Sequence, residues 1–214
     1  MDHQEQRLEL IDTARMMNSR GLNHGTSGNV SVRAGEGMLI TPSAMKYEQC
    51  RPEDIVYVRP DGTTSGSVRR PSTEWRFHRD IYRRRQEAGA VLHAHSPWCT
   101  TLACLHREIP AFHYMVAVAG GNSIRLAPYA TFGTRELSDH ALAALQDRKA
   151  CLLANHGLLC LERDLEAVLD LAVEVENLAR VYCATLQIAT PQLLDDAEIN
   201  RVLALFADYR PAAG

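Results

Sequence analysis

The sequence predicts an α/β sandwich of the α+β kind, in which helices flank a central, largely antiparallel sheet. Short apolar runs with strand-like alternation are separated by tight turns, such as those at residues 35–37 and 61–62, which are typical of antiparallel hairpins. Stretches with helical spacing of apolar residues stand between and after these runs. The 214 residues suit one domain, residues 1–214, because no linker, repeat or low-complexity tract divides them.

The first third is expected to contain one helix and several strands. Apolar residues at Leu8, Ile11 and Met17 follow helical spacing, and Gly21 is a plausible stop for that helix. Strands are expected at residues 30–33, 38–40 and 55–58.

The rest of the chain alternates between helices and strands. A helix is predicted to open at residues 71–74 and to run to Arg85, with Ser72 or Thr73 as its N-cap and Glu74 in its first turn. Strands are expected at residues 90–95, 115–119, 124–127, 151–154 and 158–161. Further helices are expected at residues 98–106, 135–145, 164–189 and 196–209.

Composition restricts the partners and the compartment. The formal charge is −3, with 23 basic and 26 acidic residues, so no basic excess is available for a nucleic-acid partner. The N-terminal stretch is charged, and no segment has the apolar length that crosses a membrane, so we expect a cytoplasmic protein without a membrane partner. The six cysteines are scattered without a C-x-x-C pair, which indicates reduced thiols that mostly pack in the core.

Two histidines mark the end of the strand expected at residues 90–95. Side chains alternate along a strand, so His93 and His95 point the same way, and two imidazoles on one face can hold one ion. The alternative is a pair of hydrogen-bonded core histidines, which would need partners for up to four ring nitrogens.

His156 is the candidate for a third metal ligand. It follows the expected buried strand at residues 152–154 and precedes the glycine turn at Gly157, just as His93 follows the apolar strand residues 91–92. Three neutral imidazoles suit Zn²⁺ and leave coordination positions open for a substrate, which is a catalytic pattern. The spacing leaves Mn²⁺, Co²⁺ and Fe²⁺ open.

Glu74 is the candidate proton-transfer group beside this metal, since a carboxylate near a metal can act as general base or acid. The alternative is a structural role, in which the Glu74 carboxylate is stabilised at a helix N-terminus by the helix dipole. Small polar loops support an anionic substrate, because their backbone N–H groups and hydroxyls can hold an anion. These are residues 25–29, residues 41–44 and the pair Ser72 and Thr73, and together they suggest a phosphorylated substrate.

An ordered set of motifs resembles the class II aldolase/adducin family over nearly the whole chain. The motifs are GTSGNVSVR, LITPSAMKYE, RPSTEWRFHRDIY, VLHAHSPWCT, PAFHYMVAVAGGNSI, APYATFGTREL and LLANHGLLC. The resemblance implies a zinc-dependent aldolase that reversibly cleaves L-fuculose 1-phosphate, or a related 5-deoxy-ketose 1-phosphate, to dihydroxyacetone phosphate and an aldehyde. It also implies the family's α/β sandwich and a homotetramer with sites between subunits.

The resemblance also implies residue roles. His93, His95 and His156 match the zinc ligands, and Glu74 matches the glutamate that completes the metal shell at rest and transfers the proton at the carbon freed by cleavage. Tyr114 matches a tyrosine that reaches into a neighbouring subunit's site and handles the proton on the aldehyde-side oxygen. The positions matched to the substrate and its phosphate are Gly28, Asn29, Ser43, Ala44, Ser72 and Thr73, with Tyr209 over the aldehyde end. Ala44 stands where close relatives have glycine, and alanine tolerates positive φ poorly, so this loop is expected to sit differently.

Three other functions remain open within this resemblance. A salvage aldolase would act on 5-deoxyribulose 1-phosphate or 5-methylthioribulose 1-phosphate, and a difference of one methyl or thioether is too small to read from a sequence. A sugar-phosphate 4-epimerase typically has aspartate in place of Glu74. A non-catalytic adducin-like interaction module would be marked by loss of the three histidines, which are all present here.

Overall fold

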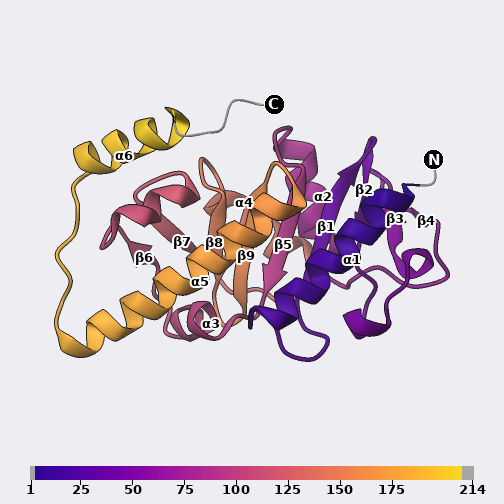
Figure 1. Ribbon diagram of the computed structural model, residues 1–214, viewed down its shortest axis with the longest axis horizontal. Coiled ribbons are helices and arrows are strands. Elements are labelled where there is room, and N and C mark those ends of the chain that lie inside the picture. The colour runs from indigo at the N-terminus through magenta and orange to yellow at the C-terminus, as the bar shows by residue number, and fades with distance from the viewer. Residues whose placement is uncertain (1–2, 209–214) are drawn as a thin grey trace.

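The computed structural model describes residues 3–208 and is built around a nine-stranded sheet with the order β4-β3-β2-β1-β5-β9-β8-β7-β6 (Figure 1). Within these residues, neighbouring strands run antiparallel except β7 and β8, which are parallel. The strands are β1 (Asn29–Ala34), β2 (Gly37–Ile40), β3 (Val56–Val58), β4 (Thr64–Ser65), β5 (Ala90–Ala94), β6 (Ile109–Pro110), β7 (Ser123–Ala127), β8 (Ala150–Leu153) and β9 (Gly157–Glu162). The predicted α/β sandwich with a largely antiparallel sheet is confirmed.

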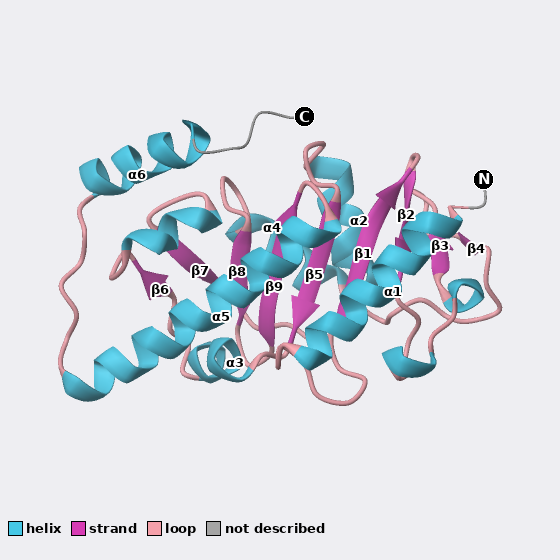
Figure 2. Cartoon of the chain, in the orientation of Figure 1, coloured by secondary structure: helices cyan, strands magenta, loops and turns pink. Residues whose placement is uncertain are grey.

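Helices cover both faces of the sheet (Figure 2). Helices α1, α3 and α5 pack on one face, α2 and α4 pack on the other, and α6 contacts the short helix η3. The helices are α1 (Gln4–Ser19), η1 (Tyr47–Gln49), η2 (Pro52–Asp54), α2 (Trp75–Arg84), α3 (Pro97–Cys104), η3 (Tyr114–Ala119), α4 (Arg135–Ala144), α5 (Leu165–Ile188) and α6 (Asp196–Asp208).

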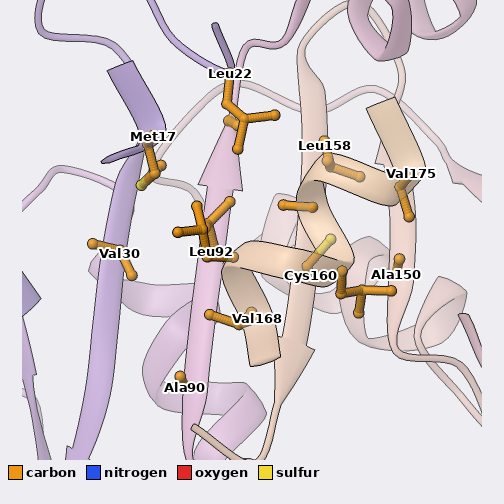
Figure 3. Packing of buried hydrophobic residues seen from close by; sticks show 14 of the residues in the cluster. Met17, Leu22, Val30, Ala90, Leu92, Ala150, Leu158, Cys160, Val168 and Val175 are labelled. Carbon is orange, nitrogen blue, oxygen red and sulfur yellow. The ribbon is translucent and has the colours of Figure 1, made fainter. Parts of the chain in front are cut away.

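Side-chain alternation divides the apolar residues into two core layers. On β5, Leu92 packs with Val30 and Val168 in the layer under α1, α3 and α5 (Figure 3), whereas Val91 packs in the layer under α2 and α4. Both faces of the central strands are therefore buried, so their sequences read as nearly continuous apolar runs. The polar residues that do occur on these strands need partners inside the protein.

Two local predictions were wrong. The run at residues 115–119 forms the 3₁₀ helix η3 instead of a strand, because a short apolar run has no periodicity that separates the two conformations. Helix α2 has Glu74 itself at the N-cap, in place of Ser72 or Thr73, and the Ser72 hydroxyl accepts a hydrogen bond from the Glu74 backbone N–H at 3.3 Å. The elements β6, η1 and η2 were not expected from the sequence.

All six cysteines are free thiols, and four of them are buried, as expected. Among residues 3–208, none of the helices combines the length and the apolar character that a bilayer crossing requires.

Candidate metal centre

Strand β5 delivers the first two candidate ligands. His93 lies on the strand and is fully buried, and His95 follows the last strand residue. Both side chains point to the face that carries α2, as strand alternation predicts. The backbone N–H of His95 donates a hydrogen bond to Oδ1 of the buried Asn23 at 3.0 Å, which fixes the chain just past the strand end.

The turn between β8 and β9 delivers the third candidate ligand. Asn155 has a φ of 53°, and the backbone N–H of His156 donates to the Leu153 carbonyl at 3.0 Å, so the turn is tight. Gly157 then begins β9 directly against β5, where an added Cβ would lie 2.3 Å from the Ala94 carbonyl oxygen. A glycine is needed here because the two strands approach so closely.

The ligand atoms converge with Glu74 at one point. One atom from each of Glu74, His93, His95 and His156 lies within 4.8 Å of the others. The Nε2 atoms of His93 and His95 are 3.0 Å apart. Oε2 of Glu74 lies 3.3 Å from His93 Nε2, and Oε1 lies 3.1 Å from His156 Nε2.

The chemistry of these atoms fits a bound cation. His93 donates its Nδ1–H to the Leu158 carbonyl at 2.8 Å, so its Nε2 carries a bare lone pair that faces the Glu74 carboxylate. Oε1 of Glu74 is buried and accepts no hydrogen bond from the described residues. Two acceptors that face each other at this distance repel, and a cation held between them removes the repulsion. A carbonyl that fixes the ring of a histidine ligand is the usual support of a metal site.

The protonation states also favour metal binding. Burial lowers the pKa of His93 to about 4 and also lowers the pKa of His95, so both rings are neutral at pH 7 and can bind a metal. Burial raises the pKa of Glu74, but the charge of His93 and His156 in their protonated forms and hydrogen bonding lower it by more, so the net shift is downward. The centre therefore offers neutral nitrogen ligands and one carboxylate, a set that suits Zn²⁺ and related transition metals.

A pocket of about 340 Å³ opens beside these ligands. His95, His156 and Glu74 line one part of it. The small polar residues of the three predicted loops line another part, namely Thr26, Ser27, Gly28, Asn29, Ser43, Ala44, Ser72 and Thr73. The exposed aromatic rings of Tyr129 and Phe132 also line the pocket.

The predicted site residues thus fall into three groups. The candidate ligands Glu74, His95 and His156 and the loop residues line one pocket, and the fully buried His93 joins them in the four-residue cluster. Ala44 adopts a φ of 55°, in the left-handed region that favours glycine. Tyr114 begins η3, where it is half exposed, and it does not line this pocket of its own chain within the described residues. Tyr209 lies outside the described residues.

Sequence reasoning missed three residues at or behind the pocket. Tyr129 and Phe132 line it, and the signal for them was the motif APYATFGTREL, which was noted without assigning roles. His78 is not among the predicted site residues, but its Nε2 lies 2.5 Å from Oδ1 of the pocket residue Asn29. Its spacing of one helical turn from Glu74 was the available signal.

Comparison with known proteins agrees with this geometry. The profile described as "Class II Aldolase and Adducin N-terminal domain" matches residues 8–183. The chain is 58% identical over 200 residues to the 5-methylthioribulose-1-phosphate/5-deoxyribulose-1-phosphate aldolase of Rhodospirillum rubrum, covering 94% of this chain and 90% of that protein. It is 52% identical over 203 residues to the L-fuculose phosphate aldolase of Escherichia coli K12, covering 94% of each.

Solved structures support the same assignment. An L-fuculose 1-phosphate aldolase structure superposes with a TM-score of 0.91 at 38% identity, covering 94% of this chain and 95% of the other. Sequence, fold and the four-residue cluster point the same way. The chain therefore belongs to the class II aldolase and adducin family, and it is an aldolase, a carbon–carbon lyase, of that family.

Proposed function

We propose that this aldolase is zinc-dependent and cleaves a ketose 1-phosphate to dihydroxyacetone phosphate and an aldehyde. The observation that carries the proposal is that the cluster of three histidines and a glutamate shares its residues Glu74, His95 and His156 with a pocket that a cradle of small polar residues also lines. A metal held by these ligands can bind the carbonyl and hydroxyl oxygens of a substrate, and the cradle of polar residues can bind its phosphate. A substrate with both groups close together fits such a pocket.

His93, His95, His156 and Glu74 would hold the metal. When bound there, a divalent metal supplies Lewis-acid stabilisation of negative charge on the substrate oxygens. The hydrogen bond to the Leu158 carbonyl fixes the orientation of the His93 ring, and burial favours the neutral forms of His93 and His95. Zinc is favoured by the nitrogen-rich set, with Mn²⁺ and Co²⁺ as the alternatives.

Glu74 would transfer the proton at carbon. In the cleavage direction the C4 hydroxyl gives its proton to a base on the aldehyde side and becomes the aldehyde carbonyl, while the electrons of the C3–C4 bond pass to C3. The ionised Glu74 takes up one proton from water and delivers it to C3 to complete dihydroxyacetone phosphate, so one proton is released and one is consumed. Its carboxylate is buried at the metal centre, lines the pocket and is ionised at neutral pH. Glu74→Gln is expected to reduce turnover strongly while the three histidines still bind metal.

The polar loops would bind the phosphate. Asn29, Ser43, Ser72 and Thr73 offer side-chain donors, and the left-handed backbone at Gly28 and Ala44 turns the loops around the pocket. Such concave arrangements of hydroxyls and backbone N–H groups bind anions. We place the remaining proton transfer, at the aldehyde-side oxygen, on Tyr114 from a neighbouring subunit of a homotetramer. Tyr209 would cover the aldehyde end, and we place the enzyme in the cytoplasm.

The aldehyde part of the substrate defines two candidates. L-fuculose 1-phosphate is one, and a salvage substrate, 5-methylthioribulose 1-phosphate or 5-deoxyribulose 1-phosphate, is the other. The exposed rings of Tyr129 and Phe132 at the pocket suit an apolar aldehyde end, which both candidates have. The relative with 58% identity is named for the salvage substrates, and this supports them as the second candidate.

The test is release of dihydroxyacetone phosphate, followed with a coupled reductase, from all three ketose 1-phosphates with and without a chelator. Chelator-sensitive release supports the proposal, and restoration by Zn²⁺, Mn²⁺ or Co²⁺ ranks the metals. The ratio of kcat/KM values chooses between the candidates. No release from any of the three by metal-loaded protein would refute this proposal.

A further inference from the structure

A row of buried polar side chains leads away from Glu74 into the core. Nδ2 of Asn29 donates to Oε2 of Glu74 at 3.0 Å, and Oδ1 of Asn29 lies 2.5 Å from Nε2 of His78. Nδ1 of His78 lies 2.7 Å from the Ser31 hydroxyl, which lies 2.9 Å from the Tyr82 hydroxyl. All five residues are buried, and His78 and Ser31 are fully buried.

The row follows from the pairing of β1 with α2. Asn29 and Ser31 are two residues apart on β1 and share the face that carries α2, while His78 and Tyr82 are one turn apart on α2. Asn29 is the cross-strand partner of His93, so the row ends beside the metal ligands. The polar face of β1 therefore meets a polar stripe of α2 inside an otherwise apolar layer.

Chemistry fixes the direction of every hydrogen bond in the row. An ionised carboxylate only accepts, so Asn29 turns its NH₂ to Glu74 and its carbonyl oxygen to His78. His78 must then donate from Nε2, and because burial lowers the pKa of this ring to about 3, it is neutral and accepts at Nδ1. Ser31 donates to Nδ1 and accepts from Tyr82. Each donor points towards Glu74.

We propose that His78 is a positioning residue, which as the Nε2–H tautomer locks the Asn29 amide so that its NH₂ holds the Glu74 carboxylate. Asn29 also lines the pocket, so the orientation of its amide sets both the position of Glu74 and the group presented to the substrate. Without His78, the side-chain oxygen of Asn29 loses its buried hydrogen-bond donor. The Asn29 amide can then rotate by half a turn, so that its oxygen faces the Glu74 carboxylate and the two acceptors repel. The kinetic part of this inference rests on the proposed function.

The first part of the test is spectroscopic and does not depend on activity. Long-range proton–nitrogen correlation on the full chain with ¹⁵N-labelled histidine reports the tautomer of each ring, and His78→Gln assigns the signal. The expected result is a neutral His78 with the proton on Nε2. A proton on Nδ1 alone, or a doubly protonated ring, at pH 7 would overturn the inference.

The second part compares variants by kcat per bound metal and by KM. His78→Phe fills the site without a donor and is expected to lower kcat about 10-fold to 100-fold, as loss of a supporting hydrogen bond commonly does. KM should rise by a smaller factor, because the Asn29 amide also faces the substrate pocket. His78→Gln retains a donor for Asn29 and should recover most of the lost kcat. Ile81→Val, on the same helix and in the same core layer, is the matched control for lost packing.

The outcomes separate the two proposals. Full kcat per bound metal in His78→Phe, or the same loss in Ile81→Val, would overturn the role of His78. If His78→Phe does not fold, Ser31→Ala removes the donor to Nδ1 with little loss of volume and is expected to lower kcat in the same direction; unchanged kcat would overturn the inference. If wild-type protein cleaves none of the ketose 1-phosphates, the proposed function fails, and the tautomer alone decides the placement of His78.

Discussion

A single methyl group added at Gly157 is expected to damage the metal centre through the backbone. The Cβ of Gly157→Ala would lie 2.3 Å from the Ala94 carbonyl oxygen and 3.3 Å from the Cα of His95, whereas ordinary contact begins at 3.4 Å. Both neighbours are backbone atoms, so the ends of β5 and β9 must separate by about 1 Å, and overpacking of this kind costs about 1–3 kcal/mol of stability.

This separation acts directly on two of the proposed ligands. His95 follows β5 and His156 precedes β9, so a shift of about 1 Å between the strands far exceeds the roughly 0.2 Å within which metal–ligand distances are held. We expect the affinity for Zn²⁺ to fall about 10-fold to 100-fold, which corresponds to about 1.4–2.8 kcal/mol. Competition with a chromophoric chelator measures the affinity, and thermal unfolding of the metal-free protein measures the stability.

Gly37→Ala provides the matched control. An added Cβ there would lie 2.4 Å from the Val58 carbonyl oxygen, in the β2–β3 pair and away from the metal ligands. It should lower stability to a similar extent and leave the zinc affinity unchanged. Wild-type affinity in Gly157→Ala, or an equal loss of affinity in both variants, would refute the argument that the β5–β9 contact sets the ligand geometry.

Three further predictions follow from the same structure. Ala44→Gly should raise the free energy of unfolding by about 0.5–1 kcal/mol in urea titrations, because it removes about 1–2 kcal/mol of left-handed strain at the cost of chain entropy; a loss of stability would contradict the strain. For the metal-free protein, the free energy of unfolding should fall as the pH falls from 6.5 to 4.5, since burial lowers the folded-state pKa of His93 to about 4 and that of His78 to about 3. The unfolded chain then takes up protons that the folded chain does not, at up to about 1.4 kcal/mol per pH unit for each histidine, and a flat profile in urea titrations would refute it. Mixed oligomers of Tyr114→Phe and Glu74→Gln chains, each inactive alone, should gain activity, because a Glu74→Gln chain supplies its wild-type Tyr114 to the intact Glu74 site of a Tyr114→Phe neighbour; no gain of activity on mixing would place Tyr114 in its own chain's site.

Strand alternation predicted much of the geometry of the candidate metal centre. The i, i+2 spacing of His93 and His95 gives their common direction, because a strand permits no other arrangement. The prediction that His156 joins His93 and His95 depended on the assumption that two strand ends face one cleft. Residue spacing alone does not reveal that β9 pairs with β5. The fold class was confirmed, while the single-domain division of residues 1–214 stays a prediction.

The row behind Glu74 was missed for an identifiable reason. Polar and apolar residues alternate along β1, a pattern that normally indicates one face in water. Here the polar face, with Asn29 and Ser31, is buried against α2. The position of His78 in the sequence does not predict these hydrogen bonds, because the partners of a buried histidine come from another secondary-structure element.

The position of β5 between β1 and β9 has a consequence for synthesis of the chain. When the ribosome has released residues 29–95, β1, β2 and β5 can already associate, but β5 still has an open edge that β9 will cover. The last ligand, His156, is made about 60 residues later, roughly 3–12 seconds at ordinary translation rates. Throughout that interval an apolar strand edge stays exposed to other chains, a known route to aggregation. Covering of this edge and assembly of the candidate metal cluster both require β9, so the complete cluster can form only after translation past residue 162.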